Sequence, residues 1–233
     1  MQAKELYERS PLRVFENSIH GGLGGGNIGV MVARTGVGKT AFLVGVAVDN
    51  LLRGRKVLHV AIDQSVEKVR EYYDEIFLDL AHASRLEDFG RERLEMERNR
   101  NIHTFLGKTF SLEKLREAVA FLRDHMHFAP VAMILDGYDF SKAAITDLLA
   151  LRRLAGEIGA EVWMSATTHR EAKRNERGVP EPVSHVEEAL SVILSMAHDG
   201  KTVQLRLLKD HDNPSVPNLS IALDPTTLLL VQE

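Results

Sequence analysis

The 233-residue sequence predicts an α/β fold, with a mostly parallel β-sheet flanked by helices. Two observations carry this prediction. Short runs of apolar residues alternate along the chain with segments whose apolar residues recur at helical spacing. Toward the C-terminus the helical segments stop and strand-like runs follow one another, which predicts antiparallel hairpins added to one edge of the sheet.

The parallel part of the sheet is predicted from apolar runs that begin at Ile28 and continue with residues 56–62, 102–106, 131–135 and 161–166. The predicted helices follow Lys39-Thr40 and cover residues 66–81, 111–125 and 145–158. Ser65 and Ser111 each stand where a serine can cap a helix N-terminus. Residues 85–100 hold five arginines and five acids, which indicates either a solvated helix or a linker.

The C-terminal part of the chain is predicted to form two hairpins after a short helix at residues 186–190. Residues 192–197 and 203–208 flank Asp199-Gly200, a dipeptide that suits a tight primed turn. Residues 219–223 and 228–231, joined through Asp224-Pro225, resemble a second hairpin.

Length and composition indicate one large domain, since 44% hydrophobic and 27% charged residues are ordinary values for a globular protein. We predict a polar, glycine-ending lead-in at residues 1–27 and the domain itself at residues 28–233. Because the chain has no cysteine, disulfides and thiolate metal sites are excluded.

Charge and hydropathy bear on where the protein is found. No apolar run reaches the roughly 18 residues that a membrane span needs, and the charged N-terminus lacks the apolar core of a signal peptide. We therefore expect a cytoplasmic protein without membrane contact. A net charge of −4 means that any binding of nucleic acid must be local.

The sequence ARTGVGKTA at residues 33–41 joins the first strand to the first long helix. A strand, a glycine loop, Lys-Thr and a helix form the pattern of a P-loop, in which backbone N–H groups and the helix N-terminus hold phosphate. The Lys39 ammonium would approach the β- and γ-phosphates, and the Thr40 hydroxyl would bind Mg²⁺. The alternative is a glycine-rich turn with an exposed lysine. The residues expected to bind nucleotide are Arg34, Thr35, Gly36, Val37, Gly38, Lys39, Thr40 and Ala41.

Two acidic residues end predicted strands at the edge where α/β sheets bind ligands. Asp136 ends the run at 131–135 and would support Mg²⁺, unless it only caps the following turn. Asp63 ends the run at 56–62 and would orient an attacking water, unless it only serves the turn before the next helix. Asp136 is thus the predicted metal ligand, with Thr40, and Asp63 the predicted catalytic residue.

Other polar residues leave the choice between function and structure open. Thr167, Thr168 and His169 follow a strand, and would either sense the γ-phosphate or serve as ordinary strand-end groups. The loop at residues 169–184 has a net excess of one positive charge without interleaved aromatics, so a solvated loop is favoured over contact with nucleic-acid phosphates. Tyr72 and Tyr73 would either stack on adenine or pack in the core.

The segment Ala33 to Thr40, with Asp63, Asp136 and Lys209, resembles the RecA-type ATPases. The resemblance is closest to the DnaB helicase branch, where alanine is usual at the first loop position, and it spans about residues 19–212. It implies a RecA-like fold that uses ATP and Mg²⁺. It also implies that Asp63, where the family normally has glutamate, activates water.

The same resemblance implies an oligomer. In DnaB and in the related clock protein KaiC, a Lys-x-Arg pair reaches into the neighbouring subunit's ATP site. Lys209 matches the lysine of this pair, and His211 stands in place of its arginine. This implies a catalytic Lys209 and a homo-oligomeric ring, commonly of six, with ATP between subunits. The loop at 169–184 corresponds to the region that RecA-type proteins use for DNA.

Three functions are compatible with this pattern. The acidic net charge and the mixed-charge loop favour a KaiC-like switch or assembly ATPase that hydrolyses ATP slowly and controls a protein partner. A motor stimulated by single-stranded DNA is the first alternative. A nucleotide-binding scaffold without turnover is the second, since Asp63 and His211 stand where the family has glutamate and arginine.

Overall fold

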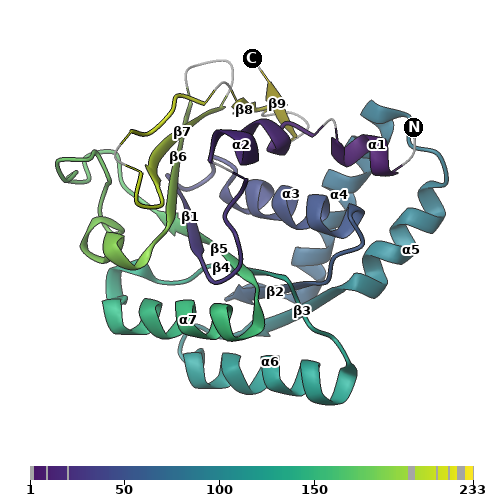
Figure 1. Cartoon of the computed structure of the whole chain (residues 1–233), viewed down its shortest axis with the longest axis horizontal. Coiled ribbons are helices and arrows are strands. Elements are labelled where there is room, and N and C mark those ends of the chain that lie inside the picture. Colours follow the sequence, from purple (N-terminus) through teal and green to yellow (C-terminus); the bar gives the residue numbers. More distant parts are fainter. Residues whose placement is uncertain are drawn as a thin grey trace.

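The computed structural model describes residues 3–8, 10–19, 21–198, 203–213, 215–219, 221–224 and 229–232 (Figure 1). Within these residues the chain forms a nine-stranded sheet with helices on both faces. The predicted α/β class, with a mostly parallel sheet and antiparallel C-terminal strands, is confirmed.

The order of the strands brings distant parts of the chain together at one edge of the sheet. In spatial order the strands are β3 (Arg100–Phe105), β2 (Val57–Ile62), β4 (Ala132–Asp136), β5 (Glu161–Thr167), β1 (Ile28–Ala33), β6 (Val192–His198), β7 (Val203–Asp210), β8 (Ile221–Leu223) and β9 (Leu230–Gln232). The first six strands in this order are mutually parallel, and β7, β8 and β9 continue the sheet with antiparallel pairings. Because the loops after β1, β2, β4 and β5 leave the same edge, their residues lie close to one another.

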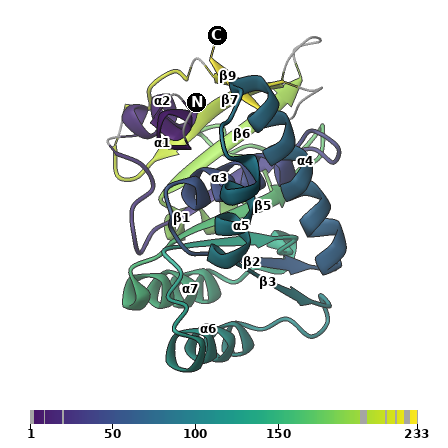
Figure 2. The same ribbon diagram turned by 90° about the vertical axis from the view of Figure 1, so that its right-hand side faces the viewer.

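Two layers of helices bury the sheet. Helices α3 (Lys39–Leu52), α4 (Val66–Ser84) and α5 (Phe89–Asn99) cover one face. Helices α6 (Leu112–Met126) and α7 (Ile145–Ile158) cover the other, as both views show (Figures 1 and 2). Strands β1, β2 and β4 are buried at every residue, which explains why their sequences are nearly continuous apolar runs, interrupted only by His59 in β2 and by Asp136 at the end of β4.

The helix boundaries follow local signals in the sequence. Ser65 and Ser111 cap α4 and α6, where their hydroxyls accept hydrogen bonds from the N–H groups of Lys68 and Lys114 at 3.2 and 3.3 Å. Gly159 ends α7 in the left-handed conformation, as C-terminal glycines commonly do. Of the two alternatives for residues 85–100, the helix is observed, as α5.

The N-terminal residues form two short helices that pack against the body of the protein. They form α1 (Ala3–Glu8) and α2 (Leu12–Ser18), which were not among the predicted elements. Leu6, Leu12 and Phe15 are buried in the same hydrophobic core as α3 and α4. The lead-in therefore belongs to the packed body of the protein on the α3 face.

The C-terminal strands match the two predicted hairpins. Strand β6 pairs with β7, and β8 pairs with β9, both antiparallel. The turn residues Asp199-Gly200 and Pro225 lie outside the described residues. The predicted short helix is a 3₁₀ segment, η2 (Ser184–Ala189), and a second one, η1 (Phe140–Lys142), follows β4. In the part of the chain described, no helix combines the length and apolar character that a membrane crossing requires.

Gly29 in β1 faces the ring of Trp163 and leaves no room for a side chain. A Cβ at this position would lie 2.6 Å from the Trp163 ring, which is itself held between Phe15 and Phe42 at centroid distances of 5.7 and 5.8 Å. We expect Gly29→Ala to lower the free energy of unfolding by about 1–3 kcal/mol, because overpacking forces the ring out of place.

Denaturant unfolding measures this effect. Gly90→Ala is the matched control, since Gly90 lies in α5 and a Cβ there would meet nothing within 4 Å. The control should be neutral or slightly stabilising, because alanine favours helix more than glycine does. Equal unfolding energies for Gly29→Ala and the wild type would contradict the close packing of this ring.

Candidate functional site

The glycine loop, residues 34–38, connects the carboxyl end of β1 to the N-terminus of α3. Gly36 and Gly38 have φ values of +78° and +108°, a conformation that residues with side chains rarely adopt. Gly38 caps α3, and its carbonyl accepts the N–H of Phe42 at 2.9 Å. A Cβ on Gly36 would meet nothing within 4 Å, so the loop borders open space there. The N-terminus of α3, which has no side-chain cap among the described residues, thus follows a loop that borders open space at Gly36, whereas Leu223 packs close to Gly38. A helix N-terminus without a side-chain cap suits an anion.

Lys39 folds back over this loop. Its Nζ lies 3.2 Å from the carbonyl oxygen of Arg34 and 3.4 Å from that of Ala33. Burial lowers the pKa of the Lys39 ammonium, and the nearby Asp136 carboxylate opposes this effect. Among the described residues, the hydrogen bonds of this ammonium go to backbone carbonyls at the mouth of the loop, where an anion could take their place.

Asp136 lies at the centre of a hydrogen-bond network at the carboxyl ends of β4 and β5. The Thr40 hydroxyl donates to Asp136 Oδ2 at 2.8 Å, and the Ser165 hydroxyl donates to Oδ1. Ser165 in turn accepts the N–H of Gly137 at 3.3 Å. The Asp136 residue is only 3% exposed. The structure therefore brings together the two residues that the sequence predicts as metal ligands.

Asp63 does not reach this network. It follows β2 with φ +58°, its side chain is exposed, and its Oδ1 accepts the N–H of Gly107 at 2.8 Å. Its own N–H donates to the carbonyl of Phe105 at 2.8 Å. The carboxylate thus holds the loop after β3, and this geometry leaves the predicted catalytic role of Asp63 without support.

The next residue, Gln64, does reach the network. Its Nε2 donates to Asp136 Oδ2 at 3.2 Å, beside the Thr40 hydroxyl. Sequence reasoning missed Gln64. The available signal was its place directly after Asp63, at the end of a strand that pairs with β4.

Lys209 lies far from the glycine loop of its own chain. Because β7 runs antiparallel, Lys209 lies opposite Ile193, which in turn lies opposite Val30 in the first half of β1. Its Nζ donates to the carbonyl of Glu187 at 2.8 Å. Burial lowers the pKa of the Lys209 ammonium, and the Glu187 carboxylate raises it. Lys209 therefore lies level with the first half of β1, away from the end of β1 at which the glycine loop begins.

Polar side chains in and beside the loop at residues 169–184 bond to neighbouring groups of the same chain. Arg177 forms an ion pair with Glu187 at 3.0 Å, and Arg174 donates to the carbonyl of Gly178 at 2.8 Å. The Thr168 hydroxyl, which the sequence left as a γ-phosphate sensor or a structural group, donates to the carbonyl of Glu181 at 2.6 Å. These contacts give Thr168 a structural role and occupy two of the loop's basic side chains.

A cavity of about 670 Å³ lies between this loop and the segment after β4. Thr167, His169 and Ser165 line it, together with three carboxylates. The carboxylates are those of Asp139, Glu171 and Glu181. An acidic cavity of this kind disfavours a nucleic-acid phosphate.

Tyr73 is a core residue rather than an exposed stacking surface. It is fully buried, its hydroxyl lies 3.1 Å from His59 Nδ1, and the Arg100 guanidinium lies 4.4 Å from its ring centroid. Tyr72 is half-buried on the same helix, with the Lys68 ammonium 5.2 Å from its ring. Of the two alternatives for these tyrosines, packing is observed for Tyr73.

No protein-family model matches the chain, and a search of curated proteins finds no match. Among the described residues, no group of three or more His, Asp or Glu side chains is arranged to hold a metal ion. A metal held by Thr40 and Asp136 would have coordination positions left for other ligands. Phosphate oxygens and water usually complete the coordination of Mg²⁺ in this way.

Proposed function

We propose that the chain is a RecA-like P-loop ATPase that binds Mg·ATP and hydrolyses it slowly to ADP and phosphate. The observation that carries this proposal is the 2.8 Å hydrogen bond from the Thr40 hydroxyl to the Asp136 carboxylate. Thr40 lies in the first turn of α3, just after the glycine loop. A hydroxyl and a carboxylate paired in this way are the protein groups that P-loop proteins offer to Mg²⁺. The open space beside Gly36, and the Lys39 ammonium that lies against the Arg34 carbonyl, suit the phosphates of the same ligand.

Each residue then has a distinct task. The glycine loop and the first turn of α3 bind the phosphates with backbone N–H groups, and Lys39 adds a positive charge. Thr40 and Asp136 would hold Mg²⁺, which when bound neutralises charge on the β- and γ-phosphates. Ser165 and Gln64 orient the Asp136 carboxylate through their hydrogen bonds.

Gln64 is also the residue best placed to orient the attacking water. Its amide nitrogen already donates to Asp136, which leaves the amide oxygen to accept a hydrogen bond from water. An amide can orient water but cannot take its proton at neutral pH, so turnover without a further activating group is slow. Slow turnover suits a switch or an assembly ATPase better than a motor.

The position of Lys209 supports an oligomer in which one chain completes the site of the next. Through the strand register, Lys209 lies level with Val30 in the first half of β1, whereas the glycine loop follows the last residue of β1. The loop at 169–184 offers less support for DNA, because Arg174 and Arg177 bond to groups of the same chain and the adjoining cavity is acidic. We therefore favour a KaiC-like switch with a protein partner over a DNA-stimulated motor.

ATP turnover and ATP affinity, measured with and without single-stranded DNA, test this proposal. We expect micromolar-range ATP binding and slow phosphate release that DNA does not change. Stimulation by DNA would favour the motor. ATP binding without any turnover would leave a nucleotide-binding scaffold, and absence of ATP binding would overturn the proposal.

The relative roles of Gln64 and Asp63 can be separated by alanine substitution. We expect Gln64→Ala to reduce turnover about 10–100-fold with ATP affinity changed less than about threefold, because it loses an orienting group for water and Asp136. Asp63→Ala should change turnover less than about threefold. It should lower the free energy of unfolding by about 1 kcal/mol, through the lost hydrogen bond to Gly107.

Single-turnover phosphate release and denaturant unfolding of the same two variants give the comparison. The reverse pattern, with turnover lost in Asp63→Ala and kept in Gln64→Ala, would restore Asp63 as the catalytic residue.

A further inference from the structure

The acidic cavity of about 670 Å³ has no task in the binding of ATP itself. It is lined by the segment after β4, the end of β5 and the loop that follows β5. Among the described residues that line it, none is a lysine or an arginine. Two aromatic rings, those of Tyr138 and Phe140, accompany the carboxylates of Asp139, Glu171 and Glu181. Negative charge next to aromatic surface fits a cation that is carried on an apolar stem.

The register of the sheet places this cavity next to the candidate phosphate site. Thr167, which lines the cavity, lies opposite Ala33, the last residue before the glycine loop. The N–H of Thr168 donates to the Ala33 carbonyl at 3.1 Å. Ser165 also lines the cavity, and its hydroxyl donates to Asp136. A group bound in the cavity would therefore lie beside Asp136 and the start of the glycine loop.

Two of the three carboxylates are available to a ligand. The side chains of Glu171 and Glu181 are exposed, and among the described residues neither forms an ion pair. Asp139 differs, because it pairs with Lys142 at 2.8 Å. Hydrogen bonds from Lys142 and Ser141 lower the pKa of the Asp139 carboxyl, so it stays ionised at neutral pH. The cavity thus offers two negative charges that no cation of the described chain neutralises.

The arrangement of these groups bears on which cation fits. Since no three His, Asp or Glu side chains of the described residues are placed to hold a metal ion, the carboxylates do not converge on one point. A guanidinium is planar, carries five N–H donors and stacks on aromatic rings, so it can serve separated carboxylates. The Tyr138 ring packs edge-on against Phe140 and Phe110, at centroid distances of 5.3 and 6.0 Å, which fixes its position. A guanidinium therefore fits better than a metal ion or an ammonium.

We propose that this cavity binds a guanidinium group on an apolar stem. Its N–H groups donate to Glu171 and Glu181, and its stem lies against Tyr138 and Phe140. Two sources offer this group, a free alkylguanidinium and the arginine side chain of a partner protein. The binding requires no nucleotide, so a negative result here would leave the proposed ATPase function standing.

Nuclear magnetic resonance titration of the full chain tests the proposal, without nucleotide, at neutral pH and low ionic strength. The probes are butylguanidinium and a blocked arginine, Nα-acetyl-arginine methylamide. We expect the amide signals of Gly137, Glu171 and Ala172 to shift, with a dissociation constant on the order of 1 mM. Blocked arginine that binds at least as tightly as butylguanidinium would assign the site to an arginine side chain. Weaker binding of the blocked arginine would assign it to a free alkylguanidinium.

Two further probes test the chemistry of recognition. Nα-acetyl-citrulline methylamide has nearly the shape of the blocked arginine but no charge. It should bind at least about 10-fold more weakly, because hydrogen bonds between charged groups contribute that much. Nα-acetyl-lysine methylamide should bind at least about threefold more weakly, since a compact ammonium cannot reach separated carboxylates. Equal affinity of either probe and the blocked arginine would overturn the proposal.

The double variant Glu171→Gln/Glu181→Gln keeps the shape of the cavity and removes the two available charges. It should weaken the binding of butylguanidinium and blocked arginine at least about 10-fold. Glu176→Gln is the matched control, because Glu176 is exposed in the same loop and is not among the residues that line the cavity. It should keep the affinity of the wild type, and thermal melts establish that both variants are folded. Unchanged affinity in the double variant, or no binding of either guanidinium to the wild type, would also overturn the proposal.

Discussion

Lys39→Ala is expected to reduce ATP turnover at least about 100-fold and to weaken ATP binding. Removing a charged group that stabilises a transition state typically costs two to three orders of magnitude. In this structure the Lys39 ammonium donates to the carbonyl oxygens of Arg34 and Ala33, at 3.2 and 3.4 Å. Because burial lowers its pKa, an incoming phosphate would relieve part of the cost of keeping it charged. Phosphate release at saturating ATP measures the effect.

Lys114→Ala is the matched control for this substitution. Lys114 is exposed in the first turn of α6, and its Nζ also donates to a backbone carbonyl, that of Thr109 at 2.8 Å. Its removal should leave turnover unchanged, because α6 covers the face of the sheet opposite α3. Full turnover in Lys39→Ala would rule out the glycine loop as the site of hydrolysis.

The sheet could be predicted because strands that are buried on both faces consist almost entirely of apolar residues. Strands β1, β2 and β4 are nearly continuous apolar runs, and the serines before α4 and α6 cap those helices as expected. The pairing of Thr40 with Asp136 was also predictable. In a parallel sheet the ends of β1 and β4 lie at one edge, so residues 96 positions apart meet there.

The side-chain directions after β2 could not be predicted in the same way. A strand end determines where a residue lies, but its φ angle determines where the side chain points. Asp63 has φ +58°, which turns its carboxylate to Gly107 and brings Gln64 to Asp136. No pattern in the sequence distinguishes these two neighbours, because both are polar residues at the same strand end.

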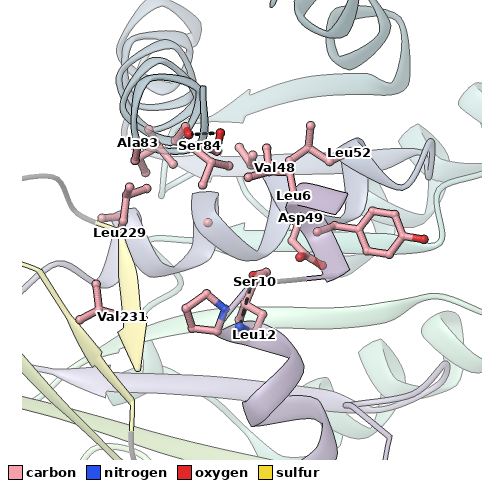
Figure 3. Close-up of a pocket in the computed structure, with 16 residues that line it drawn as sticks. Leu6, Ser10, Leu12, Val48, Asp49, Leu52, Ala83, Ser84, Leu229 and Val231 are labelled. Atoms are coloured by element: carbon pink, nitrogen blue, oxygen red, sulfur yellow. Dashed lines mark hydrogen bonds between the residues drawn. The ribbon is translucent and has the colours of Figure 1, made fainter. Parts of the chain in front are cut away.

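The N-terminal helices were missed for a different reason. Helices α1 and α2 have six and seven residues, too short to be stable on their own or to show a clear helical period. They persist because Leu6, Leu12 and Phe15 are buried against the body of the protein. A cavity beside Asp49, lined by residues of α1, α2, α3 and α4, was unpredictable for the same reason, since α1 and α2 form part of its wall (Figure 3).

Asp136→Asn is expected to remove the effect of Mg²⁺ on ATP binding and to reduce turnover at least about 100-fold. The amide keeps the shape of the carboxylate but loses the charge that a divalent cation requires. Thr40, Ser165 and Gln64 all donate to Asp136, so the amide nitrogen must face at least one donor. We therefore also expect a loss of about 1–3 kcal/mol in the free energy of unfolding.

Calorimetry with Mg²⁺ and with EDTA separates the metal from the nucleotide. Wild type should bind ATP more tightly with Mg²⁺, whereas Asp136→Asn should bind equally in both buffers. Asp139→Asn is the matched control, because Asp139 lies three residues further on and pairs with Lys142 at 2.8 Å. It should keep the Mg²⁺ effect. If Asp136→Asn also kept it, the contact between Thr40 and Asp136 would be structural, and the metal would have to bind elsewhere.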